Sequence, residues 1–291
     1  MAILDRLRFV CDADPVPALR VLPGFHPGRS VFPRRQNPAW FRPYGHGQWF
    51  QAEKSKMQFY VESERQEGWL APYSVTLIAD DRTGLLPEEV FAILEVIPDA
   101  KLTMVELAID FSPVTNVTRD FVRRFGVFGK SGRDLSGDNP MGDWWGARKG
   151  GKRIKSYFKD QVFGHRVEFL LRSRFLRHYE IRDVFDFRRF NDLLPRHHIL
   201  FARLDEERLV ARLRGTGFST ARTIGILRRV AERKDLCAAL TYLRRRIRLK
   251  NSRRLLVPLR TNKLVLQALR EWTAMWPITP KQLRKKEAKY S

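Results

Sequence analysis

Acidic side chains occupy alternating positions in two apolar segments, the spacing that places them on one face of a β-strand. In residues 105–110 the apolar residues alternate with Glu106 and Asp110, and in residues 166–172 they alternate with Glu168. If both strands belong to one sheet, three carboxylates share a face and repel one another unless cations lie nearby. Oxygen ligands suit Mg²⁺ or Mn²⁺, hard ions that favour phosphate chemistry. We therefore interpret Glu106, Asp110 and Glu168 as candidate metal ligands.

A tyrosine between two lysines follows the same alternation in a nearby strand. Ile154 and Phe158 are expected to face the core, which leaves Tyr157 outward. A free tyrosine is a weak nucleophile because its pKa is about 10, but a metal-bound phosphate and neighbouring cations can support its attack. Lys155 and Lys159 supply such cations, so the three side chains are candidates for catalysis on a phosphodiester. The alternative is a solvent-facing sheet surface with ordinary salt bridges.

The segments around these residues are expected to form a sheet with flanking helices. Strands are predicted at residues 56–62, 73–79, 102–111, 153–160 and 166–172, helices at 87–97 and 118–125, and a glycine-rich loop at 126–152. The last two strands are joined by a short connection that is consistent with an antiparallel hairpin. We therefore predict an α+β fold in which residues 56–190 form an antiparallel-sheet catalytic domain.

The two ends of the chain differ from this middle part. Residues 1–55 are rich in proline, glycine and aromatic residues, which predicts an irregular N-terminal segment. Residues 191–291 are predicted to be mainly helical, with one helix over 204–213 and another that begins near Ser219 or Thr220. A glycine-containing turn between those helices permits a helix-turn-helix motif, and two ordinary packed helices are the alternative.

Positive charge is concentrated in the last third of the chain. The 291 residues carry a formal net charge of +23, and residues 203–291, with 24 Lys and Arg against 7 Asp and Glu, carry +17 of it. Such a segment repels itself unless a polyanion neutralises it, and nucleic acid is the commonest such partner. The arginines expected to contact DNA in this basic helical region are Arg222, Arg228, Arg229, Arg244, Arg245, Arg246, Arg253 and Arg254.

Composition and motifs exclude several other classes of protein. No run of eighteen apolar residues exists, which argues against a membrane span, and the first residues lack the pattern of a secretory signal. Cys11 and Cys237 are too few for a disulfide framework or a cysteine-based metal site. No glycine-rich phosphate loop of the ATPase type is present. A cytoplasmic bacterial protein associated with nucleoid or plasmid DNA is expected.

Three segments together resemble the plasmid and phage replication initiation factors of the Rep-trans type. They are the acidic strand 105–111, the Gly-Ala-Arg-Lys-Gly loop that leads into Lys-Ser-Tyr-Phe-Lys within 145–159, and the Arg-Val-Glu strand at 166–172. Their order and approximate spacing match the family pattern over roughly residues 55–190. The resemblance implies a metal-dependent enzyme that nicks and rejoins origin DNA to start rolling-circle replication.

The resemblance also implies roles for individual residues. Tyr157 would attack a phosphodiester, keep the 5′-phosphate and release a 3′-hydroxyl, with Mg²⁺ or Mn²⁺ held by the three carboxylates. Arg148, Lys155 and Lys159 would hold phosphate, and Arg148, Lys149 and Arg153 are expected to contact DNA. The implied partners are origin duplex, single-stranded DNA, a second copy of the chain in a homodimer, and a helicase that acts after the nick.

Two other functions and one other nucleophile stay open on the sequence. A non-catalytic, sequence-specific DNA-binding protein would use the basic helical region alone, with the sheet as a scaffold. An RNA-binding module would need aromatic stacking strands, and no such motif is visible. Tyr179, expected in a helix, is the rival of Tyr157 as nucleophile.

Overall fold

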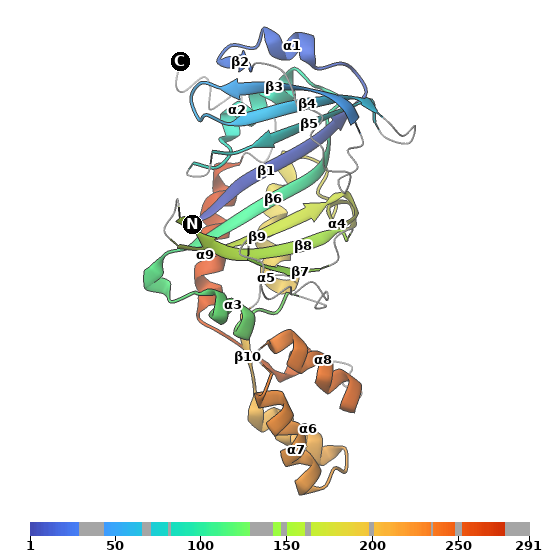
Figure 1. Cartoon of the computed structure of the whole chain (residues 1–291), viewed down its shortest axis with the longest axis vertical. Coiled ribbons are helices and arrows are strands. Elements are labelled where there is room, and N and C mark those ends of the chain that lie inside the picture. The colour runs from blue at the N-terminus through green and yellow to red at the C-terminus, as the bar shows by residue number, and fades with distance from the viewer. Residues whose placement is uncertain are drawn as a thin grey trace.

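A nine-stranded antiparallel sheet forms the centre of the molecule, with strand order β2-β3-β4-β5-β1-β6-β9-β8-β7 (Figure 1). The computed structural model describes residues 1–28, 44–65, 71–80, 83–128, 142–146, 150–160, 164–197, 201–233, 235–247 and 252–276. The strands are β1 (Ala2–Cys11), β2 (Phe25–Pro27), β3 (Tyr44–Ala52), β4 (Gln58–Arg65), β5 (Tyr73–Ile78), β6 (Lys101–Phe111), β7 (Asp143–Trp145), β8 (Lys152–Lys159) and β9 (Gly164–Arg172). A separate two-stranded sheet pairs β10 (Ala202–Leu204) with β11 (Leu256–Pro258).

Capping side chains explain where three of the helices begin. The helices are α1 (Val16–Arg20), α2 (Pro87–Glu95), α3 (Arg119–Phe125), α4 (Ser173–His178), α5 (Phe190–His197), α6 (Glu206–Gly215), α7 (Thr220–Ala231), α8 (Leu236–Ile247) and α9 (Thr261–Met275), with 3₁₀ turns at Pro113–Thr115, Val184–Arg189 and Ser252–Leu255. Thr118, Asp205 and Ser219 cap α3, α6 and α7, since each side chain accepts a hydrogen bond from a backbone N–H in the first turn.

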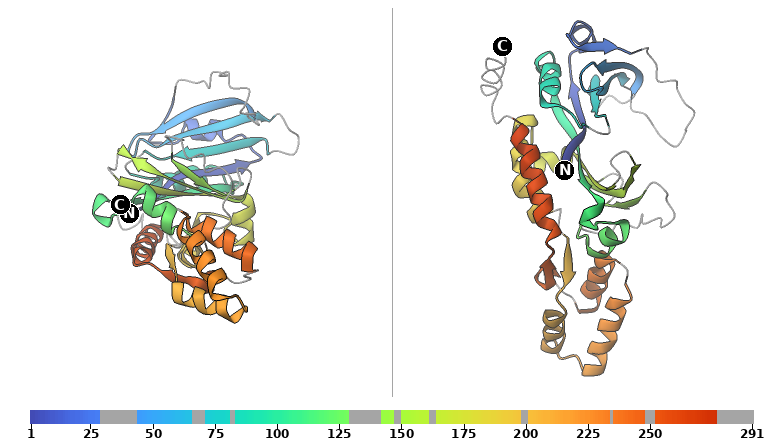
Figure 2. Two further views of the ribbon diagram at one scale, coloured as in Figure 1. Left: turned by 60° about the horizontal axis from the view of Figure 1, so that its bottom comes forward. Right: turned by 90° about the vertical axis from the view of Figure 1, so that its left-hand side faces the viewer.

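One face of the sheet is covered by helices, and α5 and α9 lie side by side against it (Figure 2). Alternate residues of the strands, such as Leu107 and Phe169, point into this layer and are fully buried. They share one hydrophobic core with Phe187, Trp272 and Trp276. We call the opposite side of the sheet the polar face, because it carries Arg6, Glu106, Asp110, Arg166 and Glu168.

The described residues between Asp205 and Leu255 form an arm, which is connected to the rest of the chain through the β10–β11 pair (Figure 1). Helices α6, α7 and α8 make up the arm, and they bury a small core of their own from Leu209, Leu213, Ile226, Leu243 and Leu255. The arm therefore has a small core of its own, and α8 also packs on α3 and Val127 outside the arm.

The N-terminal segment is the main correction to the predicted fold. Residues 2–11 are not irregular: they form β1, which lies between β5 and β6 in the middle of the sheet, and residues 44–52 form β3. The predicted boundary at residue 191 also does not separate a helical region from the sheet, because α9 belongs to the main core. Proline and glycine clusters mark turns reliably, but pairing with distant strands decides whether the residues beside them form a sheet.

The broader expectation is confirmed, since the molecule is α+β with a large antiparallel sheet and several helices. Phe158 lies on the side of β8 opposite Tyr157, but the prediction that it faces the core is wrong, because 56% of it is exposed. Within the described residues, no helix is long and apolar enough to cross a membrane.

Candidate active site

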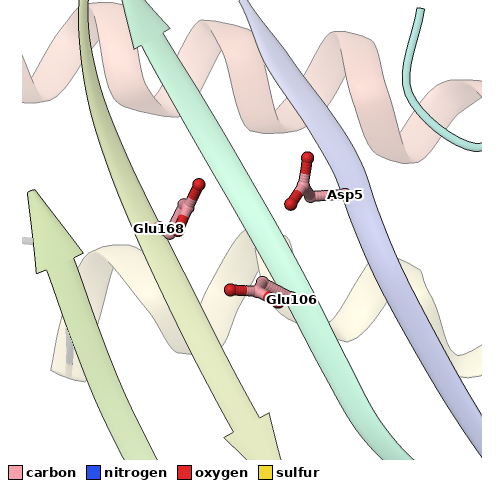
Figure 3. Close-up of side chains that lie close together, drawn as sticks. All are labelled: Asp5, Glu106 and Glu168. Atoms are coloured by element: carbon pink, nitrogen blue, oxygen red, sulfur yellow. The ribbon is translucent and has the colours of Figure 1, made fainter. Parts of the chain in front are cut away.

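Three carboxylates converge on the polar face of the sheet, from Asp5 on β1, Glu106 on β6 and Glu168 on β9 (Figure 3). One oxygen from each lies within 4.8 Å of the others. The three strands are neighbours in the sheet, so adjacent backbones hold the cluster together. Glu106 and Glu168 were predicted as metal ligands from the sequence, whereas Asp5 was not.

A β-bulge explains why Asp5 joins this cluster. Leu4 pairs with Leu107 and Arg6 pairs with Glu106, so Asp5 is an extra residue on β1. Strict alternation would point Asp5 to the helical face together with Leu7. Bulges re-aim side chains in this way and are common beside functional sites.

Burial makes the ionised forms of Asp5 and Glu106 unfavourable. The side chains of Asp5, Glu106 and Glu168 are only 14%, 11% and 4% exposed. Burial, together with repulsion from Glu168 and Asp5, raises the pKa of Glu106 to about 7, although Arg6 opposes the shift. Burial also raises the pKa of Asp5, with repulsion from Glu168 as the next cause. A bound cation would favour the ionised state of all three.

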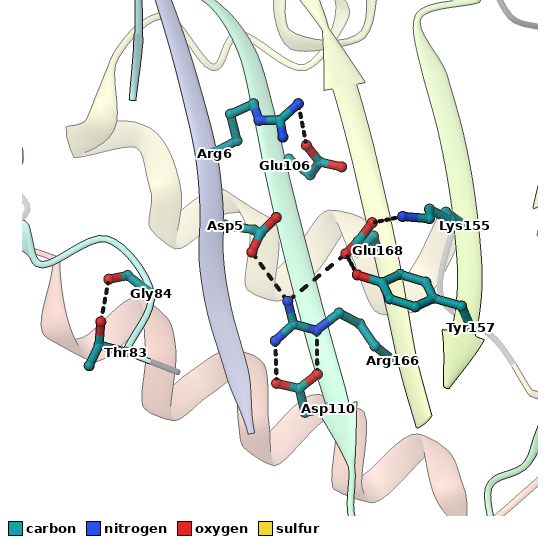
Figure 4. A network of polar contacts seen from close by, with 10 residues as sticks. All are labelled: Asp5, Arg6, Thr83, Gly84, Glu106, Asp110, Lys155, Tyr157, Arg166 and Glu168. Atoms are coloured by element: carbon teal, nitrogen blue, oxygen red, sulfur yellow. Dashed lines mark hydrogen bonds and ion pairs between the residues drawn. The ribbon is translucent and has the colours of Figure 1, made fainter. Parts of the chain in front are cut away.

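Asp110, the third predicted metal ligand, is outside this cluster. Its two carboxylate oxygens accept hydrogen bonds from Nε and Nη2 of Arg166 at 2.6 and 2.7 Å (Figure 4). The two residues are direct partners across β6 and β9, and Arg166 is fully buried. Since a planar guanidinium engages both oxygens, Asp110 acts here as the counter-ion of Arg166.

Tyr157 lies beside the cluster and contacts it directly. Its hydroxyl donates a hydrogen bond to Oε1 of Glu168 (Figure 4). Burial, repulsion from Glu168 and this hydrogen bond raise the pKa of Tyr157 above its usual value. Glu168 is therefore placed to accept the phenolic proton, while the neutral phenol is the stable form in the resting site.

Cations surround the carboxylates. Nζ of Lys155 lies 3.5 Å from Oε2 of Glu168, Nη1 of Arg6 lies 3.5 Å from Oε2 of Glu106, and Nη1 of Arg166 lies 3.2 Å from Oδ1 of Asp5. Lys159 is the last residue of β8, where it pairs with Gly164, and it is buried. Its positive charge lowers the pKa of Asp5 and so opposes the effect of burial. The sequence predicted that Lys155 and Lys159 lie on the same side of the strand as Tyr157, and the structure places both near the carboxylates.

Hard divalent cations fit the oxygen donors of Asp5, Glu106 and Glu168. Glu106 supports this fit because its buried Oε2 accepts no hydrogen bond from a described residue, although the Arg6 guanidinium lies 3.5 Å away as an ion-pair partner. A buried oxygen without such a partner is unfavourable unless a ligand satisfies it. The three carboxylates could therefore hold one ion, with Glu168 shared between the ion, Tyr157 and Lys155.

The predicted DNA-contact residues fall into two groups. Arg153 lies on β8, on the polar face two residues before Lys155, while Arg148 and Lys149 are outside the described residues. The remaining candidates lie on the arm: Arg222, Arg228 and Arg229 on α7, Arg244, Arg245 and Arg246 on α8, and Arg253 and Arg254 in the turn after α8.

A hollow of about 710 Å³ lies between α7 and α8, lined by Arg229, Glu232, Arg233, Tyr242, Arg245 and Arg246. The guanidinium of Arg233 lies over the Tyr242 ring, 4.9 Å from its centre. None of the four lining arginines forms an ion pair with a residue that the structure describes. Four arginines against the single glutamate, Glu232, leave the hollow positively charged, which favours an anion such as phosphate.

Tyr179, the rival nucleophile, is placed differently. It follows the last residue of α4, and its ring packs on Phe175 with the centres 4.5 Å apart. The side chain is partly buried against the main hydrophobic core. Its packing agrees with the role of a structural aromatic residue.

The sequence carried no direct signal for Asp5 or for the Asp110–Arg166 pair. An acidic residue inside the apolar run Ile-Leu-Asp-Arg-Leu is the one local feature that points to Asp5.

Comparison with known proteins adds no assignment, because neither a family model nor a curated protein sequence matches this chain.

Proposed function

We propose that the protein is a metal-dependent enzyme that nicks and rejoins DNA through Tyr157, and that it initiates rolling-circle replication. One observation carries the proposal: the Tyr157 hydroxyl is hydrogen-bonded to Glu168, which belongs to a cluster of three buried carboxylates. The side chains that the proposal needs as nucleophile, proton acceptor and cation ligands thus lie on one face of the sheet.

In the proposed step, Oη of Tyr157 forms a bond to phosphorus and the bond from phosphorus to the 3′ oxygen breaks. Tyr157 transfers its proton to Glu168, and the departing 3′ oxygen takes a proton from solvent water. Glu168 then releases the proton that it accepted to solvent, so atoms and charge balance. The product keeps the 5′-phosphate on the tyrosine. Because the phosphotyrosine bond is itself a phosphodiester, the reverse reaction can rejoin the strand without ATP.

Asp5, Glu106 and Glu168 are the residues that would hold Mg²⁺ or Mn²⁺. The ion would supply positive charge next to the phosphate, which stabilises the charge that develops during attack. Nζ of Lys155 lies 3.9 Å from the centre of the Tyr157 ring and 3.5 Å from Oε2 of Glu168, so it supplies a second positive charge beside the nucleophile.

The arm is the proposed site for duplex origin DNA. Its exposed arginines and the hollow between α7 and α8 support binding to the phosphate backbone. Single-stranded DNA would occupy the polar face of the sheet. The further proposed partners are a second copy of the chain, in a homodimer, and a helicase that acts after the nick. The proposed location is cytoplasmic, on nucleoid or plasmid DNA.

Incubation with supercoiled plasmid and Mg²⁺ or Mn²⁺ tests the proposal. The plasmid should carry the DNA that flanks the coding sequence of this chain. The expected product is a nicked circle with protein attached to its 5′ end, and chelation of the metal should prevent its formation. Absence of both nick and adduct, with DNA binding intact, would contradict the proposal.

A non-catalytic DNA-binding protein is the second candidate, and one observation favours it. Arg6, Lys155 and Arg166 already neutralise much of the charge of the carboxylates, as they would in a purely structural network. In that case the arm would bind duplex DNA and no adduct would form. The plasmid assay therefore separates the two candidates.

A further inference from the structure

The short edge strand β7 places one residue on the polar face. Trp144 is the direct partner of Lys155 on β8 and therefore lies on the same side of the sheet as Tyr157. Its neighbours Asp143 and Trp145 are buried, with 1% and 2% exposure. Trp144 itself is half-buried, so a large aromatic side chain lies at the edge of the polar face between two buried residues.

Several contacts fix the position of β7. Both carboxylate oxygens of Asp143 accept hydrogen bonds from Arg119 and from Arg123, at 2.6 to 2.9 Å. Gly142 and Gly146, on either side of the strand, have φ of 101° and 93°. A Cβ on Gly142 would lie 2.3 Å from the backbone oxygen of Ser156, so only glycine permits this close approach. Trp144 is therefore presented by a rigid strand.

Trp144 is also part of a row of alternating cations and aromatic rings. The Arg153 guanidinium lies 3.7 Å from the centre of the indole ring. Nζ of Lys155 lies 5.4 Å from the same ring and 3.9 Å from the centre of the Tyr157 ring. The row runs along β8 from Arg153 to Tyr157 and reaches the carboxylates through the hydrogen bond to Glu168.

We infer that Trp144 and Arg153 form a stacking platform for one base of single-stranded DNA and so position the strand for attack by Tyr157. Aromatic rings and guanidinium planes are the surfaces on which unpaired bases stack, and adjacent cations hold the phosphates. This inference rests on the proposed function, because it assigns the position of the substrate strand relative to the same site.

Strand spacing agrees with that position. Trp144 and Glu168 lie on strands separated by β8 alone, and neighbouring strands are about 4.8 Å apart, so the platform is about 10 Å from Glu168 across the sheet. Stacked nucleotides rise by about 3.4 Å each. A base on the platform is therefore within about three nucleotides of the phosphate at Tyr157.

The inference is tested with a fluorescein-labelled thymidine oligonucleotide, whose binding is measured by fluorescence anisotropy without divalent metal. All proteins carry Tyr157→Phe, so that no reaction occurs. Trp144→Ala should bind about 5- to 100-fold more weakly, and Trp144→Phe should retain most of the affinity because it keeps a ring. With 2-aminopurine in the oligonucleotide, fluorescence should be quenched at one position, and Trp144→Ala should restore it.

Trp49 provides the matched control. It lies on the polar face at the far side of the sheet, where its ring packs on Tyr60 with centres 4.9 Å apart. Trp49→Ala should change oligonucleotide affinity less than about twofold. An unchanged affinity in Trp144→Ala, or an equal loss in Trp49→Ala, would overturn the inference.

The two proposals can fail separately. If Trp144-dependent binding is found but the protein with Tyr157 intact never nicks DNA, the proposed function fails and the platform stands. If nicking occurs and Trp144→Ala retains wild-type rate and affinity, the platform is wrong and the proposed function stands.

Discussion

The hydroxyl of Tyr157 donates a hydrogen bond to Oε1 of Glu168 across the β8–β9 pair. The residues are not direct partners, since Tyr157 pairs with Arg166 and Glu168 pairs with Lys155, so the contact is diagonal. This diagonal places the phenol next to the carboxylate cluster and leaves Lys155 beside the ring. Tyr157 thus has a proton acceptor and a cation in contact with it.

Tyr157→Phe is expected to abolish nicking and the covalent adduct while DNA affinity is unchanged. The variant removes only the phenolic oxygen, and the ring still occupies its place beside Lys155. Cleavage of plasmid and protein–DNA adducts on denaturing gels measure the first result, and anisotropy with duplex DNA measures the second.

Tyr179→Phe is the control for this experiment and should retain activity, because Tyr179 packs against the core. If the adduct survives in Tyr157→Phe and is lost in Tyr179→Phe, the nucleophile is Tyr179. Normal nicking by both variants, with no adduct, would indicate that water is the nucleophile.

Manganese affinity should depend on pH through Glu106. A cation binds the ionised carboxylate, and the pKa of about 7 leaves Glu106 mostly protonated in more acidic solution. Affinity should therefore rise up to about tenfold per pH unit as pH increases towards 7, and level off above it. Calorimetry at pH 6, 7 and 8 measures this change.

Glu106→Gln should lose both manganese binding and its pH dependence. Glu62→Gln is the control, because Glu62 lies on the same polar face but is paired with Arg8 at 2.6 Å. Equal losses in the two variants would place the metal site elsewhere.

Asp110→Ala should destabilise the fold by about 3–5 kcal/mol, because it leaves the fully buried Arg166 without its bidentate partner. Urea denaturation measures the free energy of unfolding. Asp12→Ala provides the comparison: Asp12 and Lys101 are 66% and 70% exposed, and loss of such a pair costs no more than about 1 kcal/mol. Similar costs for both variants would argue against a structural role for Asp110.

His165 should make the fold less stable in acid. Burial lowers the pKa of His165 to about 4 from 6.5, and the ring forms a hydrogen bond with Ser156 at 2.6 Å. The unfolded chain binds the proton first, so this stability is present above pH 6.5 and is lost as pH falls towards 4, by up to about 3 kcal/mol. His165→Gln should show a smaller loss than the wild type when urea unfolding is compared at pH 7 and pH 4.5.

The arm should account for much of the salt dependence of duplex binding. Arg229→Gln combined with Arg245→Gln should make the log–log slope less steep by about 2, since each phosphate contact contributes about 0.9. Arg188→Gln combined with Arg270→Gln removes the same charge from exposed positions outside the arm and should leave the slope nearly unchanged. The same slope for both double variants would exclude the hollow between α7 and α8 as a phosphate site.

The sequence by itself determined which face of each central strand is polar. Side chains alternate along a strand whatever lies beside it, so Glu106, Asp110 and Glu168 could be assigned to one side from local spacing, as could Tyr157. Cap residues and proline fixed the start of α2 and α3 in the same local way. These features depend only on neighbours along the chain.

Only the tertiary structure decided which polar side chains meet. The bulge that turns Asp5 towards Glu106 depends on the register between β1 and β6, whose residues are about a hundred positions apart in the sequence. Asp110 faces the expected side, but the residue directly opposite it is Arg166, which occupies both of its oxygens. Long-range register sets these partners, because alternation specifies a face and leaves the neighbouring strand unspecified.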